Sequence, residues 1–425
     1  MAASTSEVFL QLTVILLVAV VAHFVIKRFR QPTIIGEIGI GVVLGPTLAV
    51  PFLRYVGLLP QTATELFDPQ LITLFASLGA IFLLFLIGLE TDVKAIYRRK
   101  NVLVAVGGVV LPWLLGFLVA YVMVPERGLL TGRFITATFV GATLVATSTA
   151  IAAAILLELG MVRTKVATTI MGAVIVDDIL GLMVLSISLG AAEGAVDIVR
   201  IASIVGISVA FIGVTIYLGT RLFARFVVWL HRKALKSGLK NAGFMVAMAI
   251  AFSFAFLAEA IGLSAVIGAF LAGAMFSGTA LRHDFLEGIQ YLGAIFTPVF
   301  FISLGLLVNV WTLNPDLLLF GGVLLVVAFV SKLAGCGLMA RASRMSGPES
   351  LAVGYGMIPR GEVGLIIALV AEQQGIVGPD LFAIIVIVMI VVTVLPAPLI
   401  RRAFLRIRET QAAPAAEAPA GGGAT

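Results

Sequence analysis

The chain has 425 residues, of which 61% are hydrophobic and only 12% are charged, and its mean hydropathy is +1.16. A soluble domain carries about 25% charged residues, so this composition excludes an ordinary soluble protein and indicates a polytopic membrane protein. The formal net charge of +6 would suggest a nucleic-acid partner for a soluble protein, but loop charges explain it here, and we expect no nucleic acid.

The first apolar segment, residues 8–26, comes before its basic residues, Lys27, Arg28 and Arg30. A cleavable signal peptide has the opposite order, so we expect a retained span whose N-terminus lies outside the cell. Apolar runs this long and continuous fit helices rather than the strands of a barrel, in which residue types alternate. We therefore predict an all-α polytopic membrane protein surrounded by lipid.

Apolar segments continue along the chain and predict thirteen transmembrane helices. Their approximate bounds are 8–26, 33–50, 71–90, 101–124, 134–158, 166–190, 198–220, 242–260, 263–278, 290–311, 317–340, 349–373 and 380–400. With the N-terminus outside, the outside loops hold few of the 28 Lys and Arg residues: Arg54, Arg127, Arg133 and Arg200. The positive-inside rule predicts this asymmetry, and it places the C-terminus in the cytoplasm.

The fifth and twelfth spans contain residues that interrupt a helix. Gly141 and "TSTA" (147–150) lie in the fifth span, and "GYGMIPRGEVG" (354–364) lies in the twelfth. Spans four to six and eleven to thirteen then match as inverted three-helix repeats, each with a broken helix in its middle, a pattern typical of transporter binding sites. The alternative is that these glycines only allow close helix packing.

Five ionisable residues lie within predicted spans: Asp177 and Asp178 in the sixth, Lys332 in the eleventh, and Arg360 and Glu362 in the twelfth. Each charge near the bilayer centre costs about 2.5–3.5 kcal/mol on insertion scales, so such groups pair or face a cavity. The acids exceed the bases by one. The extra carboxylate must therefore take a proton or a cation, which is what an ion exchanger needs.

Adjacent residues of a helix point about 100° apart, so Asp177 and Asp178 cannot face the same point. One can meet Lys332 while the other faces a cavity, where Thr147 and Ser148 add oxygen ligands for a monovalent metal ion such as Na⁺. The alternative is a structural charge network that joins helices. Arg360 and Glu362 fit either helix locking or an ion path.

Four motifs carry a resemblance to a known family: "LVATSTAI", "VIVDDILGLMVL", "SKLAG" and "GMIPRGEVGLI". Together they resemble bacterial sodium/proton antiporters of the NapA type, in family 2 of the cation:proton antiporters, and the similarity runs from about residue 8 to 405. The resemblance implies that Asp178 is the essential ion-binding carboxylate and that Asp177 pairs with Lys332. It also implies that Thr147 and Ser148 lie where the two broken helices cross.

The resemblance further implies a homodimer and an organisation into domains. The dimerisation domain would comprise 1–97 and 241–315, the core transport domain 98–192 and 316–408, and the linker helix 193–240. Residues 409–425, rich in Ala, Pro and Gly, are expected to form a disordered tail, and no soluble regulatory domain is expected in this chain.

The expected function is electrogenic Na⁺/H⁺ exchange by an elevator-type alternating-access mechanism in the cell inner membrane. The alternative is a K⁺/H⁺ antiporter or a potassium-efflux pathway. We expect no cofactor, since Na⁺ and H⁺, with Li⁺ or K⁺ as further candidates, are transported ions. An intramembrane aspartyl protease needs two Asp residues facing each other from different helices, which adjacent residues do not provide, so we expect no enzyme.

Overall fold

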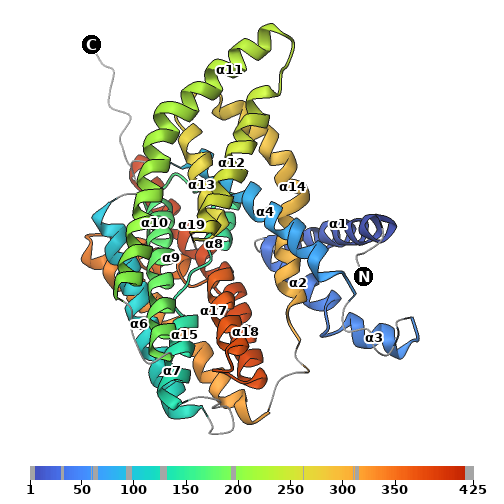
Figure 1. The fold of residues 1–425 in the computed structure, drawn as a ribbon, viewed down its shortest axis with the longest axis vertical. Helices are drawn as coiled ribbons and strands as arrows, with labels where there is room; N and C mark the ends of the chain where they lie inside the picture. Colours follow the sequence, from blue (N-terminus) through green and yellow to red (C-terminus); the bar gives the residue numbers. More distant parts are fainter. Residues whose placement is uncertain are drawn as a thin grey trace.

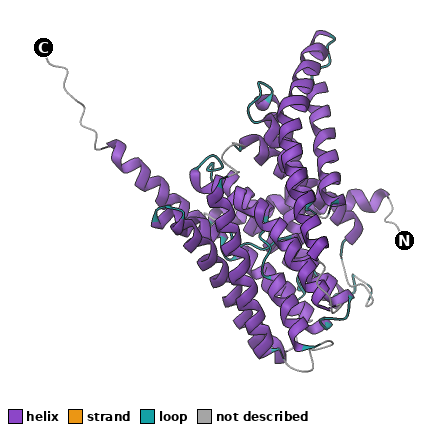
Figure 2. Ribbon diagram, turned by 60° about the vertical axis from the view of Figure 1, so that its left-hand side comes forward, coloured by secondary structure: helices purple, strands orange, loops and turns teal. Residues whose placement is uncertain are grey.

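A computed structural model describes residues 5–29, 33–58, 60, 66–91, 98–124, 132–192, 198–261, 263–309, 311 and 315–416. Within these ranges every regular element is a helix (Figure 2). The helices up to the middle of the chain are α1 (Thr5–Arg28), α2 (Thr33–Leu44), α3 (Ala49–Tyr55), α4 (Pro69–Glu90), α6 (Arg99–Met123), α7 (Arg133–Thr143), α8 (Thr149–Glu158), α9 (Lys165–Ala192), α10 (Ile198–Leu218), the π-helical turn η2 (Gly219–Phe223) and α11 (Ala224–Lys236). The rest are α12 (Ala242–Ala260), α13 (Ala265–Phe276), α14 (Arg282–Leu306), the 3₁₀ turn η4 (Pro315–Leu317), α15 (Leu318–Ala342), α16 (Gly347–Gly356), α17 (Glu362–Gln373), α18 (Pro379–Val394) and α19 (Ala397–Ala416).

Ten helices in the described ranges are long and apolar enough to cross a membrane, and three shorter apolar helices accompany them. The short ones are Thr149–Glu158, Ala265–Phe276 and Val363–Glu372, and they fall in the fifth, ninth and twelfth predicted spans. The predicted interruptions of the fifth and twelfth spans are confirmed, since α7 and α8, and α16 and α17, are separate helices. The protein is a multi-pass membrane protein, and the total of thirteen spans and their inverted repeat stay predictions.

Helix contacts divide most of the fold into two groups. In one group, α4 packs against α13 and α14, and α2 packs against α14 and α1. In the other, α6 packs against α15, α7 and α9, and α15 also contacts α16 and α18. The helix α10 touches α9 of the second group and α13 of the first, and runs along the outside of both (Figure 1).

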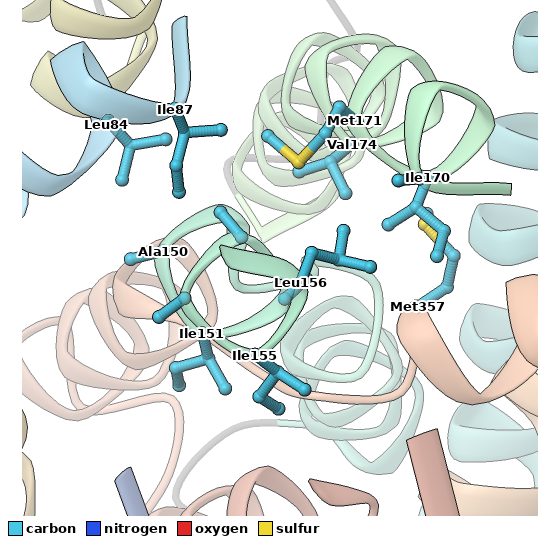
Figure 3. Close-up of a cluster of buried hydrophobic side chains, with 14 of the residues drawn as sticks. Leu84, Ile87, Ala150, Ile151, Ile155, Leu156, Ile170, Met171, Val174 and Met357 are labelled. Atoms are coloured by element: carbon cyan, nitrogen blue, oxygen red, sulfur yellow. The ribbon is translucent and has the colours of Figure 1, made fainter. Parts of the chain in front are cut away.

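The short helix α8 carries the apolar contact between the two groups. Its residues lie in one buried cluster with Leu84 and Ile87 of α4 on one side and Ile170, Met171 and Val174 of α9 on the other (Figure 3). Small and branched apolar side chains fill this interface, so burial of apolar surface holds α8 in place.

Two expectations about the ends of elements are wrong. The segment 409–416, expected to belong to a disordered tail, continues α19 as helix up to Ala416. Extending an existing helix avoids the cost of nucleation, and its alanines favour helix; residues 417–425 lie outside the described residues. In addition, α14 begins at Arg282 rather than near 290, because Phe285 and Ile289 bury an apolar face before the predicted span starts.

Glycines set the distance between α6 and α15, the pair that brings Lys332 to the core of the second group. A Cβ built on Gly335 would lie 2.1 Å from the carbonyl oxygen of Gly107, and a Cβ on Gly107 would lie 2.4 Å from that of Gly335. Since real Cβ atoms do not approach backbone oxygens so closely, any larger residue must push the helices apart.

We predict that Gly335→Ala lowers the apparent melting temperature in detergent, because overpacking at a backbone contact costs about 1–3 kcal/mol. Gly322→Ala on the same helix is the matched control, since a Cβ there meets nothing within 4 Å and alanine favours helix. Equal melting temperatures for the two variants would show that this close approach does not constrain the fold.

Candidate ion-binding site

The two helix interruptions meet each other inside the protein. The gap between α7 and α8 spans residues 144–148, and the gap between α16 and α17 spans residues 357–361. The backbone N–H of Ser148 donates to the carbonyl oxygen of Pro359 at 2.8 Å, and the Thr147 hydroxyl donates to that of Met357 at 3.3 Å. Each gap therefore satisfies backbone groups that the other leaves without a helical partner.

The local sequence explains why both helices stop here. Pro359 has no N–H to donate and disfavours helix in the residue before it. Ser148 starts α8 as its N-cap, because its side-chain oxygen accepts from the N–H of Ile151 at 3.3 Å. Gly361 lets the two gaps touch, since a Cβ on it would lie 2.8 Å from the Cα of Ser148.

Asp177, in the middle of α9, lies against the start of α8. It is fully buried, and its Oδ2 accepts the backbone N–H of Thr147 at 2.9 Å. The start of a helix exposes unpaired N–H groups and a positive dipole end, so it stabilises a carboxylate. The helix break and the acid are therefore complementary.

Lys332 of α15 completes this arrangement. Its ammonium lies 2.8 Å from Oδ1 and 3.1 Å from Oδ2 of Asp177, and it also donates to the carbonyl oxygens of Gly108 and Val145 at 2.8 and 2.5 Å. Each of its three N–H donors thus has an acceptor. A buried ion pair is tolerated when its remaining hydrogen bonds are satisfied in this way, and the predicted pairing of Lys332 with Asp177 is present in the structure.

Arg360, in the second gap, binds backbone rather than a carboxylate. Its guanidinium donates to the carbonyl oxygens of Ala328 at 2.9 Å and of Val145 and Ala146 at 3.4 Å each. Val145 and Ala146 follow the C-terminal end of α7, where a positive charge is favourable. These contacts support helix locking for Arg360, and the side chain of Glu362 lies outside the described residues.

Asp178 occupies the next position on α9, about 100° further round the helix. It is 2% exposed, and Thr147 and Ser148 are 3% and 1% exposed, so the predicted oxygen ligands all lie inside the protein rather than against lipid. In this conformation a hydrated ion can reach Asp178 only after surrounding helices move. The described residues hold no cluster of three or more His, Cys, Asp or Glu side chains, so an ion here would need hydroxyl or carbonyl ligands beside the carboxylates.

Sequence reasoning missed several groups at this site. Thr393 of α18 holds the backbone of Arg360: its hydroxyl donates to the Arg360 carbonyl oxygen at 2.9 Å and accepts from the Arg360 backbone N–H at 3.2 Å. The carbonyl oxygens of Gly108, Val145 and Ala328 are also part of it. No residue type marks a backbone carbonyl, but Thr in an otherwise apolar span is a signal that could have been followed.

Polar contacts also join the two helix groups at one end of the bundle. Glu158, at the end of α8, accepts from the N–H and hydroxyl of Thr33 on α2 at 2.9 and 3.1 Å. Glu90, at the end of α4, lies 3.5 Å from Arg163, between α8 and α9, and within its own group it lies 3.1 Å from Arg282 of α14. These contacts lie at the ends of the apolar α4–α8 interface.

We predict that Lys332→Met destabilises the protein strongly, since removing one partner of a buried pair costs about 3–5 kcal/mol. The double variant Lys332→Met/Asp177→Asn should recover part of this loss, because the uncompensated carboxylate is gone. A double-mutant cycle measures the interaction: it compares the apparent melting temperatures of the wild type, of Lys332→Met and Asp177→Asn alone, and of the double variant. Strictly additive effects would contradict a direct interaction.

Comparisons with known proteins assign the chain to a family. The family model described as "Sodium/hydrogen exchanger, transmembrane" matches residues 13–406. The chain is 32% identical to the Na(+)/H(+)-K(+) antiporter GerN of Bacillus cereus, over 94% of this chain and 96% of that protein. It is also 32% identical to an Na(+)/H(+) antiporter of Enterococcus hirae, over 93% of this chain and 97% of that protein.

Among solved structures, the fold is similar to that of the sodium proton antiporter MjNhaP1 from Methanocaldococcus jannaschii. The TM-score is 0.60 at 16% sequence identity, over 94% of this chain and 99% of that one; at this identity the likeness shows the fold alone. The resemblance to cation:proton antiporters is confirmed by the family match, while the NapA-type subdivision stays a prediction. The chain belongs to the sodium/hydrogen exchanger family, whose members are secondary transporters rather than enzymes.

Proposed function

We propose that this protein exchanges Na⁺ for H⁺ across the membrane, with Asp178 as the carboxylate that both ions occupy. The observation that carries the proposal is the buried Asp177–Lys332 pair at the crossing of two helix interruptions, with Asp178 beside it. The names of the relatives from Bacillus cereus and Enterococcus hirae support Na⁺/H⁺ antiport. The former also names K⁺, so K⁺/H⁺ exchange is the second candidate.

Competition for one carboxylate couples the two ions. Asp178 can be neutralised by a proton or by a sodium ion, with Asp177, Thr147 and Ser148 supplying further oxygen ligands. A site that holds neither ion would carry an uncompensated charge through an apolar barrier, which is costly. Because movement of the site without a bound ion is disfavoured, each outward step that carries one ion is paired with a return step that carries the other.

Lys332 sets the charge of the cycle. Its ammonium neutralises Asp177 when no metal ion is bound, and a sodium ion at the acids weakens that pair because two cations then share the same carboxylates. In this proposal the loosened Lys332 also releases its proton, so that two protons return for each sodium ion and the exchange is electrogenic.

An elevator-type motion of the core against a dimeric scaffold fits the contacts between the two helix groups. Apolar side chains of α4 and α8 form much of that contact (Figure 3), and the polar links of Thr33 with Glu158 and of Glu90 with Arg163 would break on sliding.

We further propose a homodimer in the cell inner membrane. Its N-terminus would lie outside and its C-terminus in the cytoplasm, because most basic loop residues then lie inside.

We predict that Asp178→Asn abolishes sodium-dependent dissipation of an imposed proton gradient in proteoliposomes. The wild type should show an apparent affinity for Na⁺ that weakens as the pH falls, because protons compete for the same group. Glu287→Gln, at an exposed acid on α14, is the matched control and should transport normally. Full exchange by Asp178→Asn would refute this site, and running the assay with Na⁺, Li⁺ and K⁺ separates the two candidate functions.

We predict that the double variant Asp177→Asn/Lys332→Gln removes the dependence of exchange on an imposed membrane potential while leaving Asp178 to bind ions. Both partners are neutralised together, so that neither is left as an uncompensated buried charge. Exchange rates at several potassium diffusion potentials, set with valinomycin, measure this dependence. A folded, active variant with wild-type voltage dependence would show that this pair does not set the charge of the cycle.

A further inference from the structure

The helix α10 continues through the turn η2 into α11, so that one long rod runs from Ile198 to Lys236 (Figure 1). About 20 helical residues cross the hydrocarbon core of a bilayer. Because α10 alone has 21 residues and α11 adds 13, the rod is longer than that core and its far end must pass through the headgroup layer.

One face of α11 is fixed against the protein. Ala224, Val227 and Ala234 are buried in the direction of α12, with which α11 is in contact. His231 is also buried on this face, and a Cβ on Gly243 of α12 would lie 2.6 Å from the Nδ1 atom of His231. This packing settles which side of α11 faces outward.

The outward face combines aromatic and basic side chains. Phe226 and Trp229 are 47% and 54% exposed, and their rings stack with centroids 6.0 Å apart. The ammonium of Lys233 lies 5.2 Å from the centre of the Trp229 ring, within range of a cation–π interaction. Two apolar rings are thus held in the open beside a positive charge.

The remaining exposed residues of this face give it a single sign of charge. The exposed basic residues of α11 are Arg225, Arg232, Lys233 and Lys236, and its sequence, "ARFVVWLHRKALK", contains no acid. A basic helix with aromatic residues is typical of a segment at the surface of an anionic membrane. Trp is also favoured where a helix crosses from hydrocarbon to headgroups.

We propose that the outward face of α11 binds the headgroups of anionic phospholipids at the leaflet where the rod emerges. The basic side chains attract the phosphate, while Phe226 and Trp229 insert between headgroup and acyl chain. The position of α11 directly after a membrane span and its uniform positive charge favour lipid over a protein partner or plain solvation.

Lipid quenching of Trp229 tests the proposal. The chain has three Trp residues, so the variant Trp113→Phe/Trp311→Phe leaves Trp229 as the only one. This single-Trp variant is reconstituted in two samples of phosphatidylcholine vesicles. One contains a small fraction of brominated phosphatidylglycerol, and the other contains the same fraction of brominated phosphatidylcholine. We expect several-fold stronger quenching by the anionic lipid at low salt, with the difference shrinking as NaCl is added, because salt screens charge.

Charge-neutralised variants show where the preference comes from. In the same background, both brominated lipids should quench Trp229 equally in the charge-neutralised variant Arg225→Gln/Arg232→Gln/Lys233→Gln/Lys236→Gln. The control Lys27→Gln/Arg28→Gln/Arg98→Gln/Arg99→Gln removes the same charge from exposed positions of α1 and the start of α6, and it should keep the preference. The proposal is overturned if the two lipids quench Trp229 equally in the parent protein. It is also overturned if the control loses the preference for the anionic lipid as fully as the charge-neutralised variant does.

Discussion

A buried charge needs partners, and this requirement determines how the centre of the molecule is built. Lys332 and Asp177 are both fully buried, and in an apolar medium either one alone would be costly. The protein satisfies them with unpaired backbone groups from a helix interruption: a Thr147 N–H for the acid and a Val145 carbonyl for the base. The interruptions would in turn leave costly polar groups inside the membrane without these charges. Broken helices and buried ions are thus mutually dependent.

Arg360 extends the same principle to the second interruption. Its donors meet carbonyl oxygens at the end of α7 and on α15, so its charge offsets the negative end of a helix rather than an acid. Asp178 lies next to the paired Asp177 on α9, and in the exchange proposed above it is the acid whose charge state the transported ion changes.

The sequence showed the apolar segments, the two interruptions and the need to pair Lys332 with an acid of the sixth span, because hydropathy, Gly and Pro, and charge within an apolar run each leave a mark on residue identity. The resemblance to antiporters then identified that acid as Asp177. It did not show the partners of Arg360, since any residue type can supply a backbone carbonyl oxygen, whether after a helix end as at Val145 or within a helix as at Ala328. The continuation of α19 to Ala416 was missed because composition rich in Ala and Pro does not say whether a preceding helix extends into it. The long rod of α10 and α11 lies within the linker helix expected over 193–240, although the hydropathy pattern alone gave a span that ends near residue 220.

The ammonium of Lys332 ties four segments together: its own α15, α6 through Gly108, the residues after α7 through Val145, and α9 through Asp177. A transported ion that weakens the hydrogen bonds of this ammonium removes these cross-links while it forms ligand bonds of its own. The two effects on the melting temperature therefore partly cancel. The cost of breaking these cross-links is part of the net binding free energy, so the affinity and the thermal shift that follows from it are both lower than the ion's own ligand bonds would give.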